Sequence, residues 1–146
     1  MKTVIQRVKE ASVIIEGKTN GSIQNGLVVF ICVEHNDSHS HADYLVDKLL
    51  TLRIFNDADG KMNRSIQEAK GAFLVISQFT LSADCKKGRR PSFDSSAKPE
   101  KAQSLYNYFI QKLQEGSLPV ASGVFGAMMN VHLINDGPVT FILNSI

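Results

Sequence analysis

The sequence contains little cysteine and no long apolar run, and both shortages restrict what the protein can be. Cys32 and Cys85 are the only cysteines in 146 residues, too few for a disulfide framework. No segment is apolar over enough residues to span a bilayer, and the first seven residues lack the apolar stretch of a signal peptide. Cys32 lies inside an apolar run and is expected to be a small buried residue. We therefore expect a cytoplasmic protein with reduced thiols and no membrane partner.

The net charge of the chain is also small. A formal charge of +2 is too small to indicate nucleic-acid binding by itself, but the positive charges are unevenly distributed. One short stretch around Gly88 is expected to be an exposed basic loop, because it holds four cationic residues ahead of a proline: Lys86, Lys87, Arg89 and Arg90. Such a loop can neutralise several phosphates, or it can be a solvated surface loop with no partner.

The length and composition are those of one ordinary globular domain covering residues 1–146. Hydrophobic residues make up 43% and charged residues 21% of the chain. Alternating or continuously apolar stretches predict strands over residues 3–8, 12–16, 27–33, 53–55 and 72–76. We expect the second of these to fold back on the first as a hairpin that closes at Gly17 to Gly21.

Two stretches carry apolar residues at helical spacing. The first is capped by Asp37 or Ser38, and its apolar face comprises Ala42, Leu45, Val46, Leu49 and Leu50. Pro99 opens the second and Gly116 ends it, and its apolar face comprises Ala102, Leu105, Tyr106, Phe109, Ile110 and Leu113. With two further strands near the end of the chain, these elements predict an α+β domain with many strands and two main helices.

Two patterns suggest metal ions and are rejected on their spacing. His35, His39 and His41 lie close together, but they have no companion cysteine and no helical histidine pair, so a solvated helix entry is favoured over a zinc site. The turn from Asp57 to Gly60 resembles the start of a calcium loop, but the glutamate ligand further along is missing and the glycine comes too early. We expect no metal and no cofactor.

A polar tetrapeptide, Ser77-Gln78-Phe79-Thr80, follows the apolar strand at residues 72–76. Hydroxyl and amide side chains beside free backbone N–H groups suit the binding of a carbonyl or an oxyanion. A serine nucleophile needs a base, however, and no nucleophile-elbow pattern is present. His132 is the only downstream histidine, and in an alternating strand it can be purely structural. Polar residues that satisfy a strand end remain the alternative.

The pair Gly137-Pro138 interrupts two apolar runs, Met129 to Ile134 and Val139 to Leu143. Proline cannot donate to a sheet ladder, and glycine permits close approach of another group to the backbone. The pair therefore marks either an ordinary turn or a place where carbonyl oxygens are aimed at something, through a cis or a trans peptide bond.

Six motifs occur in a fixed order along the chain. Because of these motifs, the sequence closely resembles the D-aminoacyl-tRNA deacylase family over essentially its whole length. The motifs are Gln6-Arg7-Val8, Leu52-Arg53-Ile54-Phe55, Gly60-Lys61-Met62-Asn63, Ser77-Gln78-Phe79-Thr80-Leu81, Gly88-Arg89-Arg90-Pro91-Ser92-Phe93 and Asn135-Asp136-Gly137-Pro138-Val139-Thr140. One departure is Cys85, where many members carry threonine or another small polar residue. It lies outside the motifs.

The resemblance implies a fold and an activity. The fold is a mostly antiparallel, barrel-like core with the two main helices packed outside it. The enzymes are hydrolases that release a D-amino acid, or glycine mischarged on alanine tRNA, from the acceptor end of a tRNA. They are homodimers whose active sites are completed by the partner subunit.

The resemblance also implies roles for particular residues. Ser77, Gln78, Phe79 and Thr80 match the catalytic element, and Gly137 and Pro138 match a Gly-cisPro element that rejects L-amino acids across the dimer interface. The terminal 2′-hydroxyl of the tRNA assists catalysis, which removes the need for a protein base. Further expected contributors are the pocket residues Phe125 and Met129, expected on the strand that approaches Gly137-Pro138, the supporting Arg7, and the tRNA contacts Lys86, Lys87, Arg89 and Arg90.

Two other functions stay open. One is an editing enzyme of the same fold that acts on L-alanyl-tRNA, with a trans Gly-Pro bond and a different pattern at Ser77 to Thr80. The other is a non-catalytic module that binds tRNA or DNA through the basic loop.

Overall fold

The computed structural model describes all residues from 1 to 146. It confirms an α+β fold, and the elements in chain order are β1 (Lys2–Ile15), β2 (Lys18–Ile23), β3 (Gly26–Cys32), α1 (His39–Thr51), β4 (Phe55–Asn56), β5 (Met62–Arg64), α2 (Ile66–Ala69), β6 (Ala72–Ser77), the 3₁₀ helix η1 (Phe79–Ser82), α3 (Pro99–Gln114), β7 (Val120–Ser122) and β8 (Asn130–Asn144). None of the helices combines the length and apolar character needed to cross a membrane.

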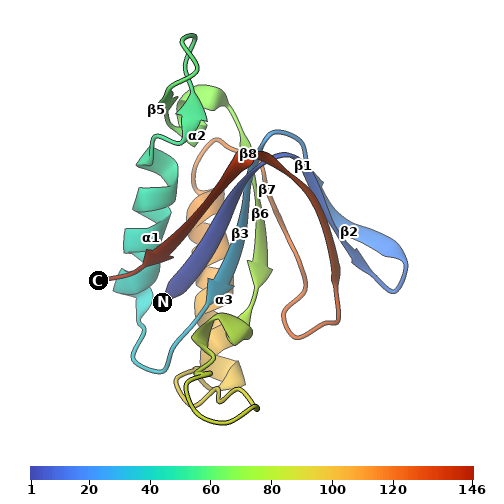
Figure 1. Ribbon diagram of the computed structural model, residues 1–146, viewed down its shortest axis with the longest axis vertical. Coiled ribbons are helices and arrows are strands. Elements are labelled where there is room, and N and C mark those ends of the chain that lie inside the picture. The colour runs from blue at the N-terminus through green and yellow to red at the C-terminus, as the bar shows by residue number, and fades with distance from the viewer.

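The main sheet is mixed and curls most of the way into a barrel (Figure 1). Strand β1 pairs antiparallel with β2, β3 and β8, whereas the β3–β6 and β6–β7 pairs are parallel. The short β4–β5 hairpin forms a separate two-stranded sheet. The mostly antiparallel, barrel-like core is therefore confirmed, with a parallel portion around β6.

The expected hairpin between residues 3–8 and 12–16 is wrong. These residues form the single strand β1, which changes partner midway: residues up to Val8 pair with β3, and residues from Ala11 pair with β2. The true hairpin turn is Glu16-Gly17, where both residues have positive φ, as a two-residue turn between antiparallel strands requires. The segment expected to close the hairpin, Gly17 to Gly21, lies largely in β2.

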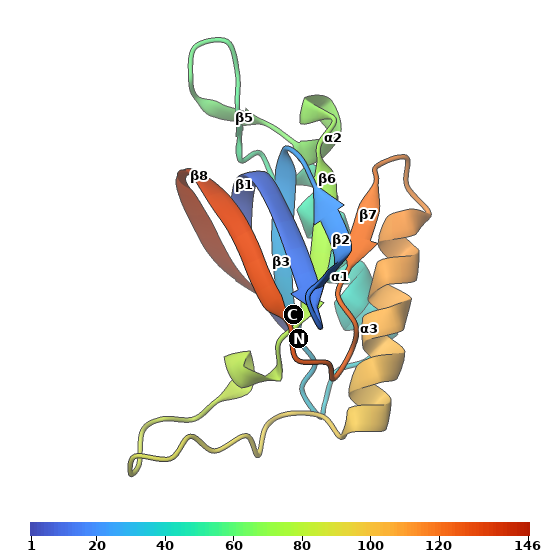
Figure 2. The same cartoon turned by 90° about the vertical axis from the view of Figure 1, so that its right-hand side faces the viewer.

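Helices α1 and α3 cover one face of the sheet (Figure 2). Ile5, Val29 and Phe73 point from the strands toward Leu45 and Phe109 on the helices, and all five are fully buried. The alternate residues of the same strands point to the other face of the sheet. There they form a second apolar cluster inside the curl of the sheet, which includes Val28, Leu74 and Ile76. The two clusters explain why β3 and β6 are continuously apolar.

The helix boundaries follow the capping signals. Ser38 is the N-cap of α1, whereas Asp37 is buried and binds the Met1 amino group and the Glu34 N–H. Pro99 occupies the first turn of α3, and the helix ends at Gln114 with Glu115 as its C-cap. The short elements α2, β5 and β7 were not predicted, because three or four residues are too few to show a period.

Tyr106 joins α3 to the sheet from a nearly fully buried position. Its hydroxyl donates to the Val75 carbonyl at 3.0 Å and lies 3.5 Å from the Gly123 carbonyl. Burial penalises the phenolate and raises the pKa of Tyr106 to about 12, against 10.0 for an exposed tyrosine.

This raised pKa predicts a loss of stability in alkaline solution. The stabilising effect of neutral Tyr106 is complete below pH 10 and disappears as pH rises toward 12, since the unfolded chain releases this proton first. From about pH 9 to about pH 11, wild type should lose about 1 kcal/mol more unfolding free energy than Tyr106→Phe. Urea titrations at several pH values measure the unfolding free energy. Its decrease with pH should be the same in Tyr44→Phe, on α1, as in wild type. An equal decrease in Tyr106→Phe would contradict the assignment.

Candidate active site

Strand β6 carries Ser77 to one end of the sheet. Ser77 stands opposite Ile31 of β3, and the N–H of Gln78 donates to the Ile31 carbonyl at 2.8 Å as the last bond of this ladder. The chain then turns directly into η1, so Ser77, Gln78, Phe79 and Thr80 all lie where a parallel strand ends. Ligands of such sheets commonly bind at this end.

The first two amides of η1 are unpaired. A 3₁₀ helix leaves its initial N–H groups without internal acceptors. The first bond of η1 runs from the Leu81 N–H to the Gln78 carbonyl, and the N–H groups of Phe79 and Thr80 donate to no acceptor in the chain. Two adjacent free amide donors are suited to bind a carbonyl oxygen and the negative charge that develops on it.

No side chain is placed as a base for a nucleophile in this element. The Gln78 side-chain amide donates to the Thr80 hydroxyl at 2.6 Å. No histidine or carboxylate hydrogen-bonds to the Ser77 or Thr80 hydroxyl. The arrangement can hold a carbonyl and orient a water molecule, but it does not form a Ser-His-Asp triad.

A mainly apolar cavity of about 570 Å³ adjoins this element. Ser77, Gln78 and Phe79 line it from one side, and Phe125 and Met129 line it from another, while Thr80 is not among its lining residues. Phe125 packs against Tyr106 with the ring centroids 5.9 Å apart. Phe125 and Met129 belong to the loop between β7 and β8, so their expected position on a strand is wrong.

Gly137 and Pro138 lie within β8, and the peptide bond between them is cis. The expected pair of strands is in fact one strand with an irregularity, because β1 continues as its partner on both sides. The register passes from Asn135 opposite Val8 to Thr140 opposite Gln6, so the four residues Asp136–Val139 stand against the single residue Arg7. We call this segment, 136–139, the β8 bulge.

The β8 bulge is fixed by side chains at both of its ends. Asn135 accepts from the Val139 N–H at 3.0 Å and donates to the Thr140 hydroxyl at 3.0 Å. A Cβ on Gly137, whose φ is +135°, would lie 2.6 Å from Val139 Cγ2 and 3.2 Å from Arg7 Nη2. Glycine is therefore required by both the backbone angle and the available space.

Arg7 connects the β8 bulge to the root of the β4–β5 hairpin. Its side chain is almost fully buried, and Nε donates to the Asp136 carbonyl at 3.1 Å while Nη1 donates to the Ile54 carbonyl at 2.7 Å and the Asn56 side chain at 3.1 Å. Nε also lies 3.3 Å from the Asp136 carboxylate. One rigid guanidinium thus fixes two loops relative to β1.

The β8 bulge and the Ser77 element lie at opposite ends of the sheet within one chain. Arg7 is level with Leu27 and Phe73, whereas Ser77 is level with Ile31. Phe73 and Ser77 are four residues apart on one strand, which corresponds to about 13 Å. In Figure 1 the bend of β8 is at the upper end of the main sheet, and the yellow-green turn of η1 is below the lower end. The chain does not bring these two predicted parts of the site together.

The four predicted tRNA contacts are exposed in a long loop between η1 and α3: Lys86, Lys87, Arg89 and Arg90. Figure 2 shows this loop extending away from the body of the molecule. Its base is closed by backbone hydrogen bonds between Asp84 and Ser92. The exposed charges are free to contact a phosphate backbone that approaches the same end of the sheet.

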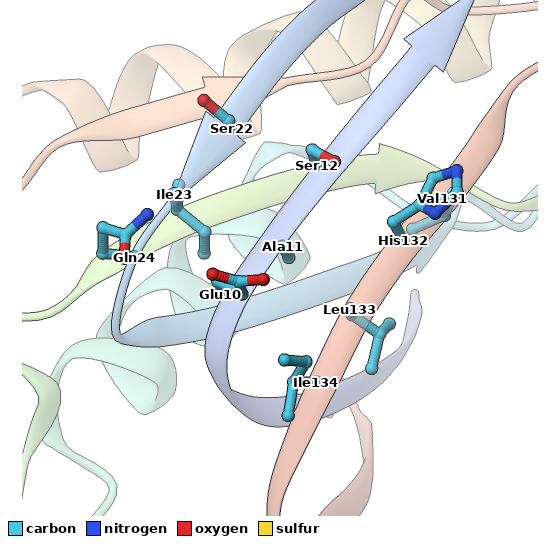
Figure 3. A pocket seen from close by; sticks show the side chains of 10 residues that line it. All are labelled: Glu10, Ala11, Ser12, Ser22, Ile23, Gln24, Val131, His132, Leu133 and Ile134. Atoms are coloured by element: carbon cyan, nitrogen blue, oxygen red, sulfur yellow. The ribbon is translucent and has the colours of Figure 1, made fainter.

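His132 lies away from Ser77, so it is no base for that element. It projects from β8 beside Ser12, its neighbour on β1, into a separate groove of about 630 Å³ (Figure 3). Glu10 and Ile134 line the same groove. This groove is not the candidate site, because none of its lining residues belongs to the six motifs.

The residues that first suggested metal ions have structural contacts. His39 packs edge-on against Tyr108 with ring centroids 4.3 Å apart, and the His41 ring bonds with Ser38 at the α1 N-cap. The Asp57 carboxylate accepts from the Asn63 side-chain amide at 2.7 Å and from two backbone N–H groups. The Asn63 bond in particular lowers the pKa of Asp57.

Sequence reasoning missed three residues beside the candidate site. Cys32, Ser82 and Ser96 all contact the Phe79 carbonyl. Cys32 is buried, as expected for a small apolar residue, but burial also raises the pKa of its thiol and keeps it protonated. Ser82 could have been noticed from its position three residues after Phe79, whereas no sequence signal indicates Ser96.

Comparison with known proteins shows which family the chain resembles. The family model described as D-Tyr-tRNA(Tyr) deacylase matches residues 4–144. A D-aminoacyl-tRNA deacylase of Solibacter usitatus is 54% identical over 145 residues, covering 99% of this chain and 96% of that protein. One from Thermosipho melanesiensis is 53% identical over 146 residues, covering 99% and 97%.

Two solved structures have the same fold. A c-Myc DNA unwinding element binding protein has a TM-score of 0.94 and 38% identity, covering 100% of this chain and 99% of that one. A probable eukaryotic D-amino acid tRNA deacylase has a TM-score of 0.83 and 18% identity, with 98% of each chain covered. The match along nearly the whole chain shows that the protein belongs to the D-Tyr-tRNA(Tyr) deacylase family, whose members are hydrolases of aminoacyl ester bonds.

Proposed function

We propose that this deacylase hydrolyses the ester that joins a D-amino acid, or glycine carried by alanine tRNA, to the terminal ribose of a tRNA. The observation that carries the proposal is the pair of unpaired amides at Phe79 and Thr80, next to an apolar cavity, in a chain that matches the deacylase family over nearly its full length. The products are the free amino acid and the tRNA.

The chemistry follows from what the element can and cannot supply. Water adds to the ester carbonyl, the carbonyl oxygen becomes negatively charged, and the bond to the ribose oxygen then breaks while that oxygen gains a proton. The free N–H groups stabilise the charged oxygen. No base contacts Ser77 or Thr80. The resemblance to the deacylase family implies that the neighbouring 2′-hydroxyl of the terminal ribose assists the water, and the protein then contributes positioning.

The cavity at the end of β6 is assigned to the aminoacyl group and the terminal adenosine. Phe125 and Met129 supply apolar and aromatic contact area, and Gln78 supplies an amide at the rim. An apolar wall of this kind binds many side chains with little preference among them. It is therefore suited to an enzyme that sorts its substrates by configuration.

Selection of the D configuration is assigned to Gly137 and Pro138 of a second copy of the chain. The residue level with the β8 bulge on β6, Phe73, is about 13 Å along the strand from Ser77, which supports a role for the bulge in the site of a partner chain. The bulge then occupies the space that an L side chain would need. Glycine passes because it has no side chain to clash.

Exposed Lys86, Lys87, Arg89 and Arg90 are assigned to the phosphate backbone of the tRNA near its acceptor end. The free thiols of Cys32 and Cys85 fit a cytoplasmic location, where aminoacyl-tRNA is found. A second candidate function is binding of tRNA or DNA without catalysis, since one relative of the same fold is described as a DNA unwinding element binding protein.

Incubation of the wild-type protein with D-Tyr-tRNA and L-Tyr-tRNA tests the proposal. We expect the D ester to be hydrolysed at least about 100-fold faster than the L ester, because about 3 kcal/mol of steric rejection corresponds to that ratio. Release of labelled tyrosine measures both rates. Binding of tRNA without turnover of either ester would favour the second candidate, and turnover of the L ester would favour an L-specific editing enzyme.

Thr80→Ala should retain measurable deacylation, within about tenfold of wild type. Its hydroxyl accepts from Gln78 and contacts no base, so its loss removes no nucleophile, whereas removal of a true nucleophile costs about 10⁴-fold or more. Single-turnover hydrolysis of D-Tyr-tRNA measures the rate. A trapped ester on Thr80 or Ser77, detected by mass spectrometry of quenched reactions, would contradict the assignment.

Arg7→Lys should reduce discrimination between D and L substrates. Lysine keeps the charge but loses the fork that joins Asp136 to Ile54, so the β8 bulge gains freedom. We expect the D-to-L rate ratio to fall about tenfold, which corresponds to about 1.4 kcal/mol. Lys9→Ala, at an exposed neighbour on β1, is the matched control and should keep the ratio. An unchanged ratio in folded Arg7→Lys would count against the role of the bulge.

A further inference from the structure

The carbonyl oxygen of Phe79 lies at the meeting point of three side chains. The Ser82 hydroxyl donates to it at 2.8 Å, the Ser96 hydroxyl lies at 3.5 Å, and the Cys32 thiol lies at 3.5 Å. These residues come from η1, from the loop that precedes α3 and from the end of β3. Their convergence from three segments on one carbonyl is more than a single 3₁₀ turn needs.

The two serine hydroxyls act in series. Because the Ser82 hydroxyl donates its one proton to the Phe79 carbonyl, the Ser96 hydroxyl donates to Ser82 Oγ, and the Ser95 hydroxyl donates to the Ser82 carbonyl at 2.9 Å. Ser82 is only 4% exposed, so water has little access to its hydroxyl as a competing hydrogen-bond partner. Because burial keeps the Cys32 thiol protonated, it remains a donor toward the carbonyl.

Fixing this carbonyl fixes an amide on the other side of the same peptide group. The atoms of a trans peptide bond lie in one plane, with the C=O of one residue antiparallel to the N–H of the next. The orientation of the Phe79 carbonyl therefore determines that of the Thr80 N–H, which is one of the two unpaired donors. Held toward Ser82 at the C-terminal end of η1, the carbonyl directs this N–H the opposite way, toward the N-terminal end of η1.

We propose that Ser82 and Ser96 are positioning residues for the hydrolysis: by clamping the Phe79 carbonyl, they orient the Thr80 N–H toward the charge that forms on the ester oxygen. The inference rests on the proposed function, since it concerns how the same site stabilises its transition state. An amide that is already oriented needs no reorganisation during the reaction, which is the source of its catalytic effect.

Ser82→Ala and Ser96→Ala test the clamp through the separation of kcat from KM on D-Tyr-tRNA. Loss of one oxyanion donor costs about 100- to 1000-fold in kcat, so partial loss of its orientation should cost about 10- to 100-fold. KM should stay within about twofold in Ser82→Ala, because Ser82 does not line the cavity assigned to the aminoacyl group. Ser96 lines that cavity, so the readout for Ser96→Ala is kcat. Ser82→Thr, which keeps the hydroxyl, should recover most of the lost kcat.

Ser40→Ala is the matched control. Ser40 also pairs its hydroxyl with another serine, Ser38, at 2.8 Å, but on the exposed surface of α1 away from η1. Its kcat and KM should equal those of wild type. Thermal unfolding of every variant identifies those that are not folded, and Ser96, which is less buried than Ser82, gives a second test if Ser82→Ala fails to fold.

The outcomes distinguish this inference from the proposed function. Wild-type kcat in folded Ser96→Ala and Ser82→Ala would overturn the clamp while leaving the deacylase proposal intact. A fall in activity that follows only the folded fraction, with no recovery in Ser82→Thr, would also overturn it. A wild-type protein inactive on D-Tyr-tRNA would overturn the proposed function and the clamp together.

Discussion

The long strand β1 is the constraint on which the rest of the structure depends. It pairs with β8 along nearly its whole length and, on its other edge, first with β3 and then with β2. Through β3 it fixes the level of β6 and so of Ser77, and through its own Arg7 it fixes the β8 bulge. A one-residue change of register would turn buried Arg7 to the other face of the sheet. The two parts of the candidate site are therefore set by one set of ladder hydrogen bonds.

The sequence predicted most clearly those elements whose apolar pattern is long or continuous. Helices α1 and α3 and strands β3 and β6 have the expected residues, because burial on one stripe or on both faces leaves a strong pattern. The hairpin within β1 was wrong for a physical reason: exposed Lys9 and Glu10 resemble a turn, but they mark the place where one strand changes partner. Partner exchange depends on residues distant in sequence and has no local signal.

The candidate site was predictable in its parts and not in its arrangement. Ser77 to Thr80 could be placed at a strand end from local pattern alone, and the motifs drew attention to Arg7 and Gly137. No local pattern could show that four residues of β8 stand opposite Arg7, or that Ser96 reaches the Phe79 carbonyl from a loop seventeen residues later. Contacts between side chains and distant backbone atoms arise only when the sheet has formed.

Under the proposed mechanism, stereochemical selection and rate are supported by different groups. The β8 bulge is held by Arg7 and Asn135 at one end of the sheet, whereas the Phe79 carbonyl is held by serines at the other. Groups this far apart with no shared partner act on free energy nearly independently. Substitutions that loosen the bulge should then alter which ester is accepted, and those at the serines should alter how fast any accepted ester is cleaved. A deacylase built in this way can reject L substrates with a rigid surface while its amide donors remain open to every D side chain.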